Sequence, residues 1–418
     1  MKRSPASFWT GLLAIGAGLL GSVPAQAAAD AADLRTVVLA RDAVSRDAVK
    51  ARRARIELRA LGADGLDVLF HTFSEELRLG SALAASGGRM PASWAPLTQA
   101  LDEVAAQKDA YSARLFWFTD LAAAQREAKR TGKPILSLRL LGRLDEELSC
   151  ANSRFFRTAL YANRELSEIL RRNWILHWES VRPVPVITVD FGDGRTMHRT
   201  VTGNSAHLVL TADGTLVDAI PGLYGPGAFL RVLQTAEGAA REASRIGESR
   251  EFLRDYHRAR LADSLRFRPE DSTIDEQSRS MMRAKSRGAF AAGSFVRVVS
   301  NFERSMAEDS ARNEETMHLK IHEWLARESG TPIRTFTARM YDELFLTPGS
   351  DPWLGLAPDA YSAIQGEGLT STPATGPASF RAPMPSAAAA GARTQSKMIV
   401  ESPLLFALGM PVVTVPRR

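Results

Sequence analysis

The chain has 418 residues, of which 45% are hydrophobic and 24% are charged, and its net charge is +6. This composition is typical of a globular protein with enough apolar residues for a core, and the length predicts two or more domains. Because the basic residues are interspersed with acidic ones, the sequence indicates no nucleic-acid partner. The single cysteine excludes an internal disulfide, so the packed core must hold the fold together.

The N-terminus has the features of a secretory signal peptide. It begins with the basic pair Lys2-Arg3, continues with an apolar run from Phe8 to Val23, and ends in the small-residue sequence Ala25-Gln26-Ala27. That run is shorter than the ~20 apolar residues that a spanning helix needs. We therefore expect residues 1–27 to be a cleaved signal peptide. The mature protein is expected to be periplasmic or secreted, in the bacterial envelope, with no membrane-bound segment.

Residues 31–113 are predicted to form a helical segment. Apolar residues at helical spacing continue to Leu61, where a turn over 62–65 leads to a second helix, Leu66 to Phe73. After a loop over residues 81–93, the stretch LTQALDEVAAQKDAY predicts another helix.

The pattern changes at Leu115, where alternating helices and apolar runs begin. An alanine-rich helix ends at Thr131-Gly132, and the following apolar run predicts a buried strand, Ile135–Leu141. A hairpin turn at residues 212–214 and a helix from about Pro226 are also predicted. Further strands are predicted near Ile175–Val181, His207–Leu210 and Leu216–Ile220.

The order of these elements resembles the thioredoxin-like superfamily over residues 115–236. The helix, the GKP sequence, the buried strand and a cysteine at the start of the next helix carry this resemblance. In the alignment, Cys150 takes the position of the attacking cysteine of a C-x-x-C motif, and Ser153 takes that of the resolving cysteine. Ser205 takes the position of the cis-proline that helps thioredoxins bind their substrate chain. The resemblance implies an α/β fold with a thioredoxin-like central domain and a candidate catalytic site at these residues.

Two groups of charges flank Cys150 in the sequence, and the alignment brings one histidine near it. A helix N-terminus favours a thiolate, Ser149 can cap this helix, and Arg154 and Arg157 would strengthen the effect. The acidic run 145–147 would oppose it. In the alignment, His207 is the one candidate base for the thiol, and a hydrogen-bonded structural histidine is the alternative.

Two functions from different classes follow from these residues. Because the resolving cysteine and the cis-proline are replaced, we expect a catalytically silent domain that serves as a protein-binding or scaffold module. The alternative is a monothiol thiol-disulfide or redox-sensing protein, in which Cys150 forms mixed disulfides or a sulfenic acid. The expected partner is a protein, or a thiol or disulfide substrate. Neither a cofactor nor a metal is expected, and the oligomeric state stays open.

Three further segments complete the chain. Residues 237–365 are predicted to be a helical C-terminal region, 366–396 a disordered linker rich in Ala, Pro, Gly, Ser and Thr, and 397–418 a C-terminal tail. His318 and His322 lie four residues apart on a predicted helix and can share a metal. No third ligand stands out in the sequence, so packing on the helix surface is favoured.

Overall fold

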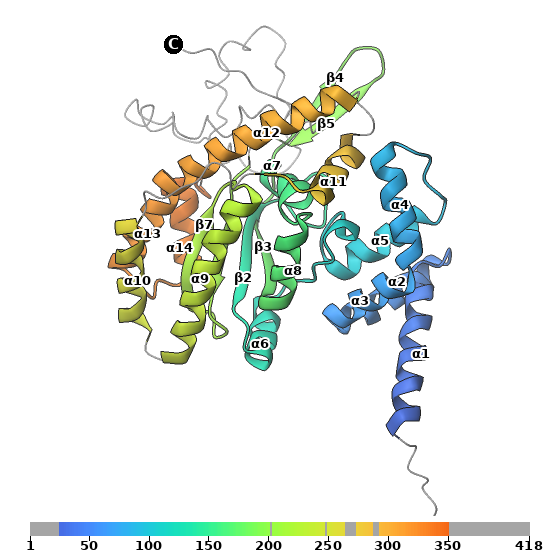
Figure 1. Ribbon diagram of the computed structural model, residues 1–418, viewed down its shortest axis with the longest axis horizontal. Coiled ribbons are helices and arrows are strands. Elements are labelled where there is room, and N and C mark those ends of the chain that lie inside the picture. Colours follow the sequence, from blue (N-terminus) through green and yellow to red (C-terminus); the bar gives the residue numbers. More distant parts are fainter. Residues whose placement is uncertain (1–24, 201–202, 247–248, 264–272, 287–291, 351–418) are drawn as a thin grey trace, which may run out of the picture.

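The computed structural model describes residues 25–200, 203–246, 249–263, 273–286 and 292–350. It is a mixed α/β protein in which helices flank a five-stranded sheet (Figure 1). Most of the predicted signal peptide, the predicted linker at 366–396 and the predicted tail at 397–418 lie outside the described residues. Within the described ranges, no helix combines the length and the apolar character that crossing a membrane requires.

The sheet has the strand order β1-β3-β2-β6-β7. Strand β3 is parallel to β1 and β2, whereas β6 is antiparallel to both β2 and β7. The four strands predicted from the sequence are confirmed, and every residue of β2, β6 and β7 is buried. The bounds are β1 Trp117–Phe118, β2 Ile135–Leu141, β3 Ile175–Arg182, β6 Ser205–Leu210 and β7 Leu216–Pro221.

Helices cover both faces of this sheet. Successive residues of a strand point to opposite faces. Leu138 of β2 pairs with His207, whose ring contacts Phe229 of α9, whereas the next residue, Arg139, pairs with Glu179 on the other face. Helices α7 to α9 therefore lie on the first face (Figure 1). The helices joined to the sheet are α6 Leu121–Thr131, α7 Ala151–Phe155 with its continuation η2 Phe156–Leu160, α8 Arg164–Asn173 and α9 Pro226–Ile246.

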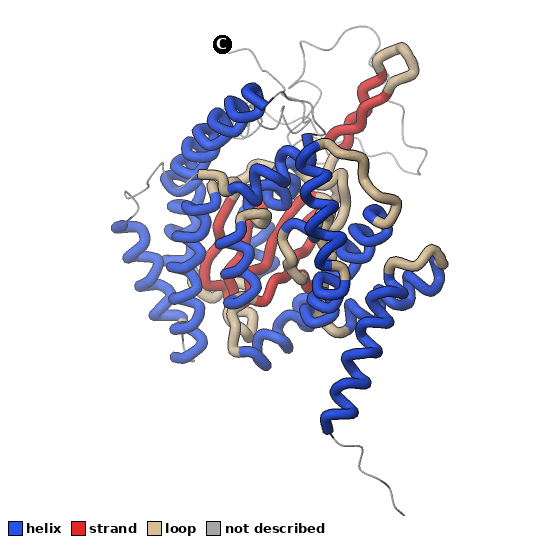
Figure 2. The backbone as a smooth tube through the Cα atoms, turned by 45° about the vertical axis from the view of Figure 1, so that its right-hand side comes forward, coloured by secondary structure: helices blue, strands red, loops and turns tan. Residues whose placement is uncertain are grey.

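An excursion separates β3 from β6. It is a two-stranded hairpin, β4 Val186–Asp190 and β5 Thr196–Thr200, and it projects from the body of the protein (Figure 2). Gly192 and Gly194 have φ values of 74° and 86° at its tip, a region that glycine adopts without strain.

The N-terminal helices have a hydrophobic core of their own, built around Leu58, Leu69 and Leu101. The loop predicted from residue 81 begins later, because α4 continues to Ser86 and ends at Gly87, whose φ is 71°. The bounds are α1 Ala25–Ala43, α2 Ala48–Ala60, α3 Ala63–Thr72, α4 Ser74–Ser86, α5 Trp94–Ala105 and η1 Ala110–Ser112.

The C-terminal helices share one core with the sheet. Phe302, Ile321 and Phe336 belong to the same buried cluster as β2 and β6, and α9 runs without a break across the predicted boundary at 236–237. The sheet and the helices that follow it therefore pack as one unit. The bounds are α10 Arg250–Asp263, α11 Glu276–Ser286, α12 Ala292–Arg312, η4 Asn313–His318, α13 Leu319–Arg327, α14 Ile333–Arg339 and η5 Met340–Leu344.

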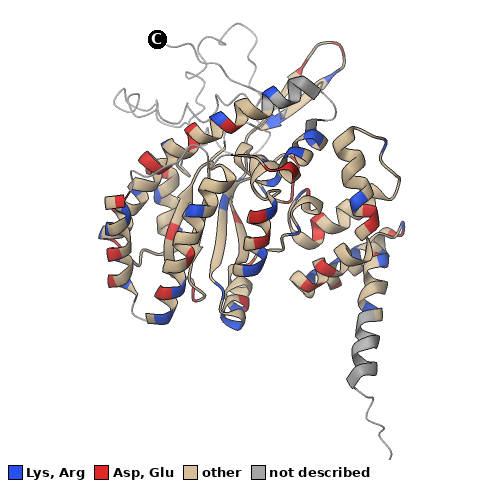
Figure 3. Cartoon of the chain, in the orientation of Figure 1, with Lys and Arg blue, Asp and Glu red and all other residues tan. Residues whose placement is uncertain are grey.

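Basic and acidic residues are interspersed over the same helices (Figure 3). Several form pairs one helical turn apart, such as Arg130 with Glu127 at 2.6 Å and Arg245 with Glu242 at 2.6 Å. Exposed pairs of this kind contribute little to stability, so the apolar cores hold the fold.

Candidate functional site

Cys150 is the N-cap residue of α7, as the sequence predicts for a helix N-terminus. Its Sγ accepts a hydrogen bond from the backbone N–H of Ser153 at 3.4 Å. The prediction that Ser149 caps this helix is wrong, because the helix starts one residue later. The Ser149 hydroxyl instead accepts from Arg157 Nη2 at 3.2 Å, and its carbonyl oxygen accepts from Thr200 Oγ1 at 2.9 Å.

The Ser153 hydroxyl does not contact the thiol through a hydrogen bond. Its Oγ donates to the carbonyl oxygen of Cys150 at 2.9 Å, and the side chain is fully buried. A serine hydroxyl at neutral pH is also no nucleophile for a mixed disulfide. Ser153 thus stabilises the first turn of the helix.

Ser205 lies beside the start of α7. Its Oγ accepts a hydrogen bond from Asn152 Nδ2 at 3.0 Å. Strand β2 links the two segments, since Ser205 pairs with Leu140 while the N–H of Cys150 donates to the Leu141 carbonyl oxygen at 3.3 Å. Cys150 and Ser205, which the sequence predicts to form one site, therefore lie at the same end of the sheet.

The ring of His207 is buried in the core, where it contacts aromatic side chains. A hydrogen bond of 2.6 Å joins His207 Nε2 to Tyr161 Oη, and the ring lies 4.8 Å from those of Phe156 and Phe229. Burial lowers the pKa of His207 to about 3. This geometry favours the structural alternative over a base for the thiol.

Acidification should therefore weaken the fold through His207. The pKa in the native protein is about 3, whereas an unfolded histidine has a pKa of about 6.5. The contribution is complete above pH 6.5 and is lost as pH falls towards 3, because only the unfolded state takes up the proton. The loss between neutral pH and pH 5 amounts to about 2 kcal/mol of unfolding free energy. Urea unfolding at several pH values should give a shallower pH dependence for His207→Gln than for the wild type; equal slopes would contradict this assignment.

The charges around Cys150 are largely paired with one another. Arg157, only 1% exposed, forms an ion pair with Asp109 at 2.9 Å. Arg154 donates to Thr200 Oγ1 at 2.8 Å, and burial is the main cause that lowers its pKa to about 10. The acidic run 145–147 forms ion pairs with other basic residues, namely Arg143 for Asp145 and Glu146, and Lys285 for Glu147.

Residues from the C-terminal part of the chain lie near the thiol. Cys150 is 0% exposed. Tyr341 of η5 donates to the carbonyl oxygen of Asn204 at 3.1 Å, and Asn204 Nδ2 donates to Thr347 Oγ1 at 3.0 Å. Burial, and then the nearby Cys150, raise the pKa of Tyr341. We call Tyr341, Thr347 and Asn204 the cover of the site.

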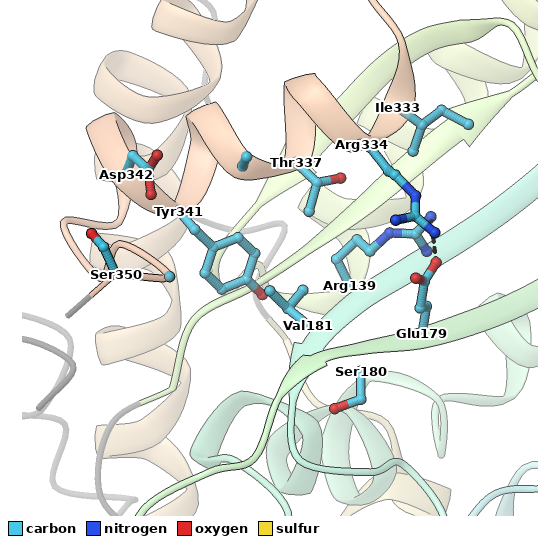
Figure 4. Close-up of a pocket in the computed structure, with 12 residues that line it drawn as sticks. Arg139, Glu179, Ser180, Val181, Ile333, Arg334, Thr337, Tyr341, Asp342 and Ser350 are labelled. Carbon is cyan, nitrogen blue, oxygen red and sulfur yellow. Dashed lines mark ion pairs between the residues drawn. The ribbon is translucent and has the colours of Figure 1, made fainter. Parts of the chain in front are cut away.

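A cavity of about 400 Å³ lies next to this cover, between strands β2 and β3 and helices α14 and η5 (Figure 4). Arg139 and Glu179 form an ion pair of 3.1 Å on its sheet side. Tyr341 belongs to both the cavity wall and the cover. The other residues around the cavity include Ser180, Val181, Ile333, Arg334, Thr337, Asp342 and Ser350.

A second cluster of polar side chains, which the sequence does not predict, lies around His318 and His322. The prediction that His318 and His322 pack on a helix surface is wrong, since they are 0% and 3% exposed. His318 Nε2 lies 3.1 Å from Asp218 Oδ1, and His322 Nδ1 lies 2.9 Å from His257 Nδ1. The partners come from β7 and α10, too far away in the chain for spacing to reveal them.

The arrangement at Cys150 limits its chemistry. A thiolate must approach a disulfide sulfur directly to attack it, and a fully buried Sγ allows this only after the residues packed around it move. The polar side chains near the thiol, Ser149, Ser153 and Ser205, form hydrogen bonds with α7 and with the chain next to it. Comparison with family models, curated proteins and solved structures finds no match for this chain.

Proposed function

We propose that this chain is an exported thioredoxin-like protein whose central domain is a protein-binding scaffold and does not turn over disulfides. The observation that carries the proposal is the complete burial of Cys150, with Ser153 in the resolving position. An enzyme of thiol exchange needs its sulfur accessible to substrate. A scaffold does not.

The order of elements supports the thioredoxin-like part of the proposal. A strand, a helix headed by cysteine, a second parallel strand, an antiparallel closing hairpin and a last helix follow one another as β2, α7, β3, β6–β7 and α9. This is the order that the resemblance implies. The hairpin β4–β5 is an addition to it.

The cavity beside the cover is where we propose that a partner binds. Arg334 is exposed at its rim, and Thr337 and Ser350 add hydroxyl groups to apolar Val181 and Ile333. A short peptide segment that carries one carboxylate suits this mixture of charge, hydroxyls and apolar surface.

A turnover assay with matched variants tests the proposal. The full-length mature protein is mixed with a small disulfide and an external thiol, and product is followed against Cys150→Ser as the blank. We expect the wild type to equal the blank. We also expect Ser153→Cys to remain inactive, because the cover still excludes substrate.

A second arm of the assay, in which the disulfide is added first and the external thiol only later, decides the monothiol alternative, which the Ser153 N–H directed at Cys150 Sγ favours. In that case the wild type would form a mixed disulfide that persists until external thiol is added, and Ser153→Cys would shorten its lifetime. Either result would show that the cover opens in solution, and would contradict the scaffold proposal.

A further inference from the structure

Asp218, His257 and His322 form a buried cluster whose ligand-type atoms all lie within 4.8 Å of one another. The three side chains are 0%, 1% and 3% exposed. They come from β7, α10 and α13, and so connect the edge of the sheet to two C-terminal helices. Carboxylate and imidazole groups are the ligands of many zinc sites.

We propose that Asp218, His257 and His322 bind one zinc ion, which ties α10 and α13 to strand β7. This site is separate from Cys150 and from the cavity beside the cover, and it revises the expectation of no metal. The three protein ligands leave the fourth position of a tetrahedral ion to a water molecule, and they join three elements of the fold.

The spacing of the ligand atoms fits this ion. Tetrahedral zinc with bonds of 2.0–2.1 Å places its ligand atoms about 3.3 Å apart. His257 Nδ1 and His322 Nδ1 are 2.9 Å apart, and His322 Nδ1 is 3.8 Å from Asp218 Oδ1. These two separations lie on either side of the ideal value, and the third separation, between His257 and Asp218, is at most 4.8 Å. Small side-chain movements would therefore bring the three ligand atoms to the spacing that zinc requires.

The hydrogen bonds within the cluster leave part of it unsatisfied. His322 Nε2 is buried and has no hydrogen-bond partner among the described residues. The facing Nδ1 atoms of His257 and His322 share one hydrogen bond, in which one ring donates its proton and the other offers a lone pair. A divalent ion would replace this hydrogen bond, because both Nδ1 atoms can then offer a lone pair to the metal.

Neighbouring groups orient the ligands, as outer groups do in known metal sites. Tyr256 Oη donates to Asp218 Oδ2 at 2.8 Å, and His318 Nε2 contacts the other carboxylate oxygen at 3.1 Å. The ring of His257 also forms a hydrogen bond with the backbone of Val217. These contacts fix the carboxylate and one imidazole before any ion binds.

The test uses the tag-free, full-length mature protein, stripped of metal with a chelator and dialysed. Zinc is titrated against a coloured indicator, and Co²⁺ is added in a second experiment as an absorbing substitute. We expect one equivalent of tightly bound zinc and the strong visible bands of tetrahedral Co²⁺. At a free zinc concentration 100 times Kd, the unfolding equilibrium constant should fall about 100-fold.

His322→Gln and Asp218→Asn should each abolish stoichiometric binding, whereas His71→Gln, which changes an exposed histidine of α3, should retain it. Circular dichroism establishes whether each variant is folded. If the variants do not fold, the zinc stoichiometry of the folded wild type still tests the proposal. Less than one equivalent of zinc in the folded wild type, or binding that His322→Gln leaves unchanged, would overturn the proposal.

Discussion

Replacing Arg157 with methionine is expected to lower the free energy of unfolding by about 3 kcal/mol. Arg157 is 1% exposed and pairs with the buried Asp109 at 2.9 Å, so its loss removes one partner of a buried charge. Lys285 Nζ stays 2.8 Å from the same carboxylate, which places the cost at the lower end for such pairs. Urea unfolding followed by circular dichroism measures the change.

Arg130→Met is the matched control, because Arg130 pairs with Glu127 on the exposed surface of α6. It should cost less than about 0.5 kcal/mol. Arg157 also donates to Ser149 Oγ beside Cys150, so the methionine variant should in addition expose the thiol more often. Equal stability of the two variants would mean that the buried ion pair does not exist in solution.

Gly65→Ala is expected to destabilise the N-terminal helices by about 3 kcal/mol, because overpacking forces the backbone to move. A Cβ at this position would lie 1.9 Å from the carbonyl oxygen of Leu58, a backbone atom of the neighbouring helix. Helices α2 and α3 therefore depend on glycine for their close approach. The N-terminal core is distinct from the core of the sheet, so the loss should stay local.

Hydrogen exchange resolves that local effect. Amides of α2 and α3 should exchange faster in Gly65→Ala, while those of β2 should be unchanged. Gly238→Ala is the control: nothing lies within 4 Å of a Cβ there, in the middle of α9. That change should stabilise the protein by about 0.5–1 kcal/mol, because alanine favours a helix. Uniformly faster exchange over β2 in Gly65→Ala would contradict the two separate cores.

The strands could be predicted from the sequence because buried strands read as continuous apolar runs. Ile135–Leu141 is apolar at every position except Ser137 and Arg139, and β2 has the same bounds. The start of α7 at Cys150 was also predictable, since the cysteine follows a strand and precedes helical spacing. Local sequence determines these features.

The contacts in the neighbourhood of the thiol could not be predicted, because residues far apart in the chain make them. Tyr341 and Thr347, which contact Asn204, lie about 140 positions further along the chain. The burial of His322 depends in the same way on Asp218 and His257. The spacing of apolar residues in the sequence shows that a histidine lies on a helix. It does not show which other elements pack over that histidine.

Alkylation of Cys150 in the native protein tests the central claim most directly. The single cysteine of the chain makes the rate unambiguous. We expect native Cys150 to react at least about 1000-fold more slowly than in urea, because a stable domain opens only rarely. The rate should rise with urea in parallel with unfolding. A native rate close to that of the unfolded chain would show an accessible thiol and would contradict the scaffold account.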